Sequence, residues 1–219
     1  MELTMAFKPS FIGLAAVLGT ILSLSNADAG AFEVTFTLTG TVDQVTGDAL
    51  DGSIVAGTAF TATYVFESTA LDIASAPEVG NYLFTVPPNS FSLTIGNYFL
   101  RAVSGGSLAA IVTNADQDVF TFSATGDESN LPGITNGFNL TLTDTTGLAL
   151  TSDALPLAPV LSAFDEPRFV LSGVLPGGSA YSAIGTITSL ASTAVPEPAT
   201  GSGIGLLALM FLRRKGIRP

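Results

Sequence analysis

Apolar and polar residues alternate along many short segments of this chain. The clearest segment, 31–41 (AFEVTFTLTGT), carries apolar residues at positions 32, 34, 36 and 38, with glutamate or threonine between them. Successive side chains of a strand point to opposite faces, so this period of two predicts a half-buried antiparallel strand. The same pattern recurs in segments 58–66, 91–95 and 138–144 and, more weakly, in 81–86, 107–113, 118–124, 168–174 and 183–190.

Turn-forming residues separate these segments. Clusters rich in Gly, Asp, Asn, Ser and Pro occupy 45–53, 86–90, 103–107, 124–133 and 174–179. Roughly nine strands joined by short polar turns predict an all-β body folded as an antiparallel β-sandwich, with a β-barrel as the alternative. No repeat of fixed period is present, which argues against a propeller or solenoid.

Residues 1–29 have the order of a secretory signal peptide. Lys8 precedes the uncharged apolar stretch 11–24, and Ala27 and Ala29 follow as an A-x-A pair. This order predicts a signal helix that is removed before Gly30. The stretch is shorter than the roughly 20 residues of a spanning helix, although an uncleaved N-terminal anchor is the alternative.

The predicted body, 30–194, has few charges, and most are negative. It contains 15 acidic residues, two basic ones (Arg101 and Arg168) and no cysteine. This charge excludes nucleic acid as a partner, since phosphate binding needs a basic face. Threonine fills the polar strand positions instead. Such a neutral surface fits either an ordinary exported domain or one that associates with itself or with an uncharged matrix.

The inventory of catalytic residues is small. Without His or Cys, the Ser-His-Asp and Cys-His arrangements and the usual zinc sites are excluded. Carboxylate pairs could serve a secreted hydrolase, but the candidates fall in turn-like segments, where acids usually form local hydrogen bonds. These pairs are Asp48 and Asp51, Asp127 and Glu128, and Asp165 and Glu166. We therefore expect no enzymatic activity and no cofactor.

One group resembles the opening of a calcium loop. Asn114, Asp116 and Asp118 stand at i, i+2 and i+4, but Val119 and Thr125 occupy the positions where an EF-hand has Gly and Glu. We expect an Asx-rich turn and no metal site.

Exposed aromatic residues would favour sugar binding. The chain has no Trp, and we expect its four tyrosines to be packing or strand-edge residues. They are Tyr64, Tyr82, Tyr98 and Tyr181.

The C-terminal segment 195–219 combines three elements. Val195-Pro196-Glu197-Pro198 must be extended, because each proline fixes its own φ and restricts the residue before it. The apolar run 199–212 follows and predicts a short helix. The basic residues Arg213, Arg214 and Lys215 come next and would stop transfer across a membrane.

This order resembles the PEP-CTERM family of bacterial sorting signals. The matching residues are Val195–Thr200, Gly205–Leu209 and Arg213–Lys215. The resemblance implies export and then processing by an exosortase at the membrane, in Gram-negative hosts that tend to make exopolysaccharide. We therefore expect a non-enzymatic protein of the cell surface or extracellular matrix, made as a membrane-held precursor. Its partners would be the export machinery, the exosortase-type enzyme, and either exopolysaccharide or further copies of itself. The alternative is a carbohydrate- or calcium-binding module with the same signal.

Overall fold

The structure is a computed structural model that describes residues 32–196, except 48, 49 and 51. The predicted signal peptide with Ala27 and Ala29, both flanking helices, Glu197 and Pro198, and the basic residues 213–215 lie outside the described residues.

The described chain is all-β, as the alternation predicts. Its strands are β1 (Phe32–Thr46), β2 (Ala59–Glu67), β3 (Val79–Phe84), β4 (Ser90–Ile95), β5 (Tyr98–Ala102), β6 (Ser107–Asn114), β7 (Asp118–Thr125), β8 (Glu128–Ser129), β9 (Thr135–Asp144), β10 (Glu166–Val174) and β11 (Ala180–Pro196). A 3₁₀ turn, η2 (Leu161–Ala163), lies in the long loop before β10.

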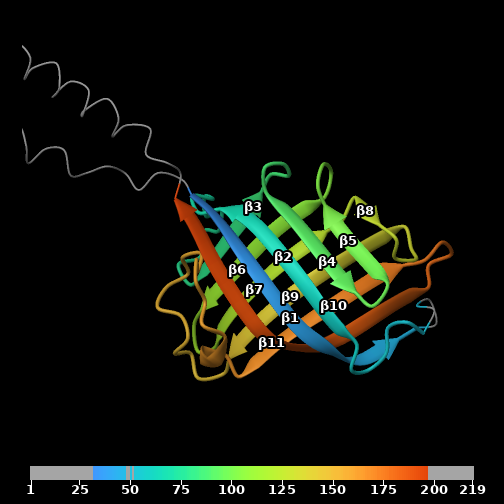
Figure 1. Cartoon of the computed structure of the whole chain (residues 1–219). Helices are drawn as coiled ribbons and strands as arrows, with labels where there is room; N and C mark the ends of the chain where they lie inside the picture. The colour runs from blue at the N-terminus through green and yellow to red at the C-terminus, as the bar shows by residue number, and fades with distance from the viewer. Residues whose placement is uncertain (1–31, 48–49, 51, 197–219) are drawn as a thin grey trace, which may run out of the picture. The chain divides into compact units, whose positions relative to one another are not determined.

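These strands form one antiparallel sheet of 11 strands in the order β3-β6-β7-β9-β10-β11-β1-β2-β4-β5-β8. Figure 1 shows the sheet curling over, so that β11, β1 and β2 cross in front of β6, β7, β9 and β10. The two layers that a sandwich requires are therefore two parts of one curled sheet. Its edge strands, β3 and β8, do not pair with each other.

The longest strands carry the bend. β11 pairs with β10 through residues 180–186 and with β1 through 182–196, and the β1–β11 register shifts after Thr39 and after Val42. Such irregularities let a strand bend. Gly40 lies at the first shift, where a Cβ atom would collide with the carbonyl oxygen of Thr186 and the ring of Phe60. The glycine thus allows close approach at the bend.

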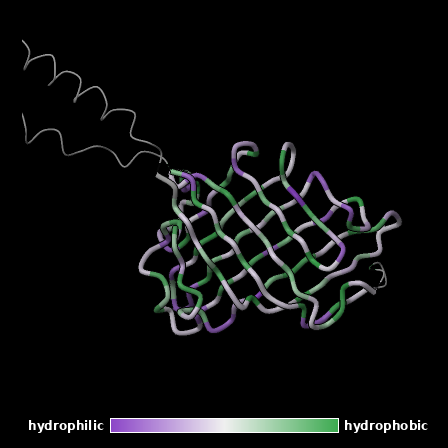
Figure 2. The backbone as a smooth tube through the Cα atoms, viewed as in Figure 1, coloured by the Kyte–Doolittle hydropathy of each residue, from purple (hydrophilic) through white to green (hydrophobic). Residues whose placement is uncertain are grey.

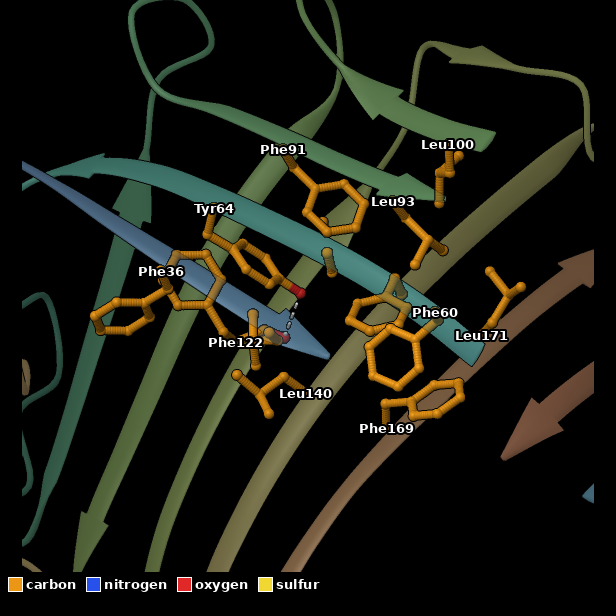
Figure 3. Close-up of a cluster of buried hydrophobic side chains, with 14 of the residues drawn as sticks. Phe36, Phe60, Tyr64, Phe91, Leu93, Leu100, Phe122, Leu140, Phe169 and Leu171 are labelled. Atoms are coloured by element: carbon orange, nitrogen blue, oxygen red, sulfur yellow. Dashed lines mark hydrogen bonds between the residues drawn. The ribbon is translucent and has the colours of Figure 1, made fainter. Parts of the chain in front are cut away.

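The core fills the space between the two layers. Figure 3 shows inward side chains of β1, β2 and β4 meeting those of β7, β9 and β10. The Tyr64 ring lies 4.2 Å from that of Phe122 and 4.7 Å from that of Phe91, between centroids. Farther along the same space, the Phe60 and Phe169 centroids are 4.1 Å apart. Figure 2 shows that hydrophobic residues alternate with less hydrophobic ones along the strands, and that many of the most hydrophilic residues lie in the loops.

Hydrogen bonds from neighbouring residues cover part of the sheet edges, at β3 and at the part of β5 that β8 does not pair with. At β5, the Phe99 N–H donates to Asn130 Oδ1 (2.6 Å), and Ser129 Oγ donates to the Phe99 carbonyl (3.0 Å). At β3, the Asn81 N–H donates to Asp72 Oδ1 (2.8 Å), and the Ile73 N–H donates to the Asn81 carbonyl (2.9 Å). Edge groups engaged in this way are not available to pair with another chain.

Candidate functional site

The two ends of the described chain lie side by side. In the β1–β11 register, Phe32 faces Pro196 and Glu33 faces Val195. On its other side, the Phe32 N–H donates to Ser68 Oγ (3.1 Å), and its carbonyl accepts from the Ser68 N–H (2.9 Å). The first two residues of the predicted sorting motif therefore complete β11 against the start of the body. Pro196 has no N–H to donate to the ladder.

Two glutamates flank this end of the sheet. Glu33 and Glu67 are exposed and directly opposite each other on β1 and β2, where like charges repel. A neighbouring cavity of about 210 Å³ is lined by both side chains and by the buried Asn89. Asn89 is already bonded, because its Oδ1 accepts from the Glu67 N–H and its Nδ2 donates to the Thr85 carbonyl, both at 2.8 Å. This end of the body is therefore acidic, and hydrogen bonds hold Asn89 in place.

The calcium-like group is only partly brought together. Asn114 and Asp118 face each other across the β6–β7 hairpin, whereas Asp116 is exposed in the turn between them. With its amide oriented to match its neighbours, Asn114 donates to Asp118 Oδ1 (3.2 Å) and accepts from the Ser152 N–H (2.7 Å). Asp118 Oδ2 accepts from the Leu150 N–H (2.7 Å). Both side chains thus hold the backbone of the loop after β9.

Asp144 holds the same loop and was not recognised from the sequence. It lies opposite Asp118 on β9 and is 4% exposed. Its Oδ2 accepts from the N–H groups of Leu148 (2.7 Å) and Ala149 (2.9 Å), and its Oδ1 accepts from the N–H (3.0 Å) and hydroxyl (2.8 Å) of Thr146. These donors, led by the Leu148 N–H, lower the pKa of Asp144 to about 2, because they favour the charged carboxylate.

This shift predicts how acid affects stability. The folded-state pKa of Asp144 lies below the unfolded value, so its contribution is present above about pH 4 and is lost as the pH falls toward 2. We expect Asp144→Asn to lower the melting temperature by several degrees at pH 7 and by less at pH 3. Thermal melts at both pH values measure this, with the exposed Asp116→Asn as the control. A deficit of equal size at both pH values would refute the assignment.

The other acidic candidates also serve turns. Asp127 accepts from Ser104 Oγ (2.7 Å) and from the N–H groups of Val103, Ser104 and Gly105, which hold its pKa well below the usual range. Asp165 accepts from the Thr145 hydroxyl (2.5 Å). Glu128 and Glu166 are exposed, and Asp48 and Asp51 lie outside the described residues. Within the described part of the chain, no three acidic side chains gather where they could hold a metal.

Three of the four tyrosines are packing residues, as predicted. Tyr64, Tyr82 and Tyr181 are at most 5% exposed. Their hydroxyls donate to the Phe122 carbonyl (3.4 Å), the Asp153 carbonyl (2.9 Å) and Asn136 Oδ1 (2.6 Å), respectively. Burial raises the pKa of Tyr181 to about 12. Tyr98 is half-buried on β5.

A cavity without acidic side chains lies in the loop before β10. It measures about 380 Å³ and is lined by residues between Ala149 and Phe164, including Leu155, Leu157 and Val160. No titratable side chain lines it, so it offers no acid or base for catalysis.

Comparisons with known proteins gave no match. No protein-family model, curated protein or solved structure matches the chain.

Among residues 32–196, apart from 48, 49 and 51, no helix is long and apolar enough to cross a bilayer.

Proposed function

We propose that this chain is an exported, non-enzymatic protein of the cell surface or extracellular matrix. A signal peptide directs its export, and residues 195–219 hold the precursor at the membrane. An exosortase-type enzyme then processes this PEP-CTERM-like tail.

The pairing of Phe32 with Pro196 is the observation that carries the proposal. The predicted leader ends shortly before Phe32, and Pro196 is the second residue of the predicted tail. A body whose ends are neighbours can be tethered through its leader, its tail or both without unfolding. Its remaining surface stays free to face the matrix.

The use of the carboxylates supports a role without catalysis. Asp118, Asp127, Asp144 and Asp165 accept hydrogen bonds that fix turns. Glu33 and Glu67 line one cavity together, but both side chains are exposed, whereas the acid of a glycosidase is shielded from water. Of the two binding-module alternatives, the geometry disfavours calcium, because Asn114 and Asp118 are already bonded to the protein.

Export is tested at the predicted cleavage site. Ala29→Phe should leave the leader attached, because signal peptidase requires a small side chain there, while the native protein should begin at Gly30. Ala31→Phe, the same change beyond the cut, is the matched control. N-terminal sequencing of exported and membrane fractions measures both variants. A native protein that retains residues 1–29 would overturn the proposal.

A further inference from the structure

Side-chain hydroxyls cover the outer face of four adjacent strands. We call this surface the hydroxyl face. It consists of Thr35, Thr37 and Thr39 on β1, Thr61 and Thr63 on β2, Ser92 and Thr94 on β4, and Ser189 and Thr193 on β11.

The strand register arranges these groups in rows. One row runs through Thr94, Thr61, Thr39 and Ser189 across β4, β2, β1 and β11. A second row runs through Ser92, Thr63 and Thr37. Neighbouring strands lie about 4.8 Å apart, so each row presents hydroxyls at roughly that spacing. Phe99 of β5 pairs with Thr94 and extends the first row with an aromatic ring.

None of the hydroxyls of this face bonds to another group of the described protein. The hydroxyls in turns differ, since Ser104 donates to Asp127 (2.7 Å) and Thr146 donates to Asp144 (2.8 Å). Each hydroxyl of the face therefore keeps one donor and two acceptor positions for an outside partner.

The face carries no charge in its interior. Glu33 and Glu67 lie at one end, Asp43 at the other, and Arg101 beyond Ser92 on β5. The interior of the hydroxyl face therefore offers no opposite charge that would attract a polyanion or a polycation. A second copy is also disfavoured, since 15 acidic and two basic residues in the body make copies repel each other.

We infer that the hydroxyl face binds a neutral, hydroxyl-rich polysaccharide. Its hydroxyls and those of such a polymer can each donate and accept, and neither partner must give up a hydrated charge. The sheet is twisted and curled, so a flexible chain follows its rows better than a flat crystalline surface does. The inference deepens the proposed function and rests on it for the presence of a matrix.

The test compares two matched fourfold variants of the full chain in a nonionic detergent without sugar groups. The first carries Thr37→Val, Thr39→Val, Thr61→Val and Thr63→Val. The control carries Thr113→Val, Thr121→Val, Thr141→Val and Thr143→Val, on the outer face of β6, β7 and β9. Valine keeps the shape and strand preference of threonine but removes the hydroxyl. Affinity electrophoresis in dextran and hydroxyethyl cellulose measures binding, with alginate as the polyanionic comparison.

We expect both neutral polymers to retard the native protein and the control, with little effect of added salt. The first variant should bind at least about tenfold more weakly, because it loses several hydrogen bonds. Equal loss in the control, no retardation of the native protein, or salt-sensitive binding to alginate alone would overturn the inference. So would sedimentation showing an oligomer that only the first variant dissociates. Processing of the first variant in cells should remain normal, which separates this test from that of sorting.

Discussion

Phe122→Ala should lower the free energy of unfolding of the body by about 3–5 kcal/mol. This is a large part of the roughly 5–15 kcal/mol by which a typical folded domain is stable. Phe122 is fully buried on β7. Its ring contacts those of Phe36, Tyr64, Phe66, Phe84 and Phe120, at centroid distances of 4.2 to 6.4 Å. Rigid rings from both layers cannot collapse into the space that it leaves.

Urea denaturation followed by circular dichroism measures the loss. Leu83→Ala on edge strand β3 is the control, because Leu83 is 63% exposed and its removal should cost less than about 1 kcal/mol. Similar losses in the two variants would show that Phe122 is not a centre of the core.

Replacing Pro196, Glu197 and Pro198 together by alanine should abolish processing and leave a membrane-held precursor. Pro196 pairs with Phe32, and in the sequence only Glu197 and Pro198 stand between it and the apolar run 199–212. In the proposed scheme, the processing enzyme would bind an extended segment close to Phe32. Alanine at 196 would restore an N–H and remove the fixed φ that keeps the motif extended.

Truncation after Thr200 should have the opposite result and release the body. It removes the apolar run and Arg213–Lys215, whose transfer across the bilayer core costs roughly 2.5–3.5 kcal/mol per residue. Pro156→Ala with Pro159→Ala, in the loop before β10, is the control for loss of prolines and should be processed normally. Fractionation with intact-mass analysis distinguishes the membrane-held precursor of the triple-alanine variant, the released body of the truncated variant and the normally processed control. Normal processing of the triple-alanine protein would show that this motif has no role in sorting.

The alternation of residues was sufficient to predict most strands, but not their arrangement. All of the expected segments form strands, and Tyr64 points inward as its position in 58–66 predicts. β5 was missed because Tyr98 and Phe99 are adjacent aromatics without a polar partner, and β8 has only two residues. The continuity of the two layers depends on the pairing of β11 with both β10 and β1, which local periodicity does not encode.

The site residues were predictable to different degrees. The spacing of Asn114 and Asp118 correctly drew attention to their turn, yet their partners, Ser152 and Leu150, lie more than 30 residues away in sequence. Asp144 was missed, although the Asp-Thr-Thr-Gly sequence that begins there is a recognisable turn signal. The hydroxyl face depends on strand register, so the sequence indicated only a threonine-rich surface.

Intact-mass analysis of the native protein from the surface and matrix of its host tests the central claim most directly. We expect a chain that begins at Gly30 and ends before the basic residues Arg213–Lys215, with a precursor of higher mass in the membrane fraction. A surface protein that retains both residues 1–29 and the basic end would contradict it.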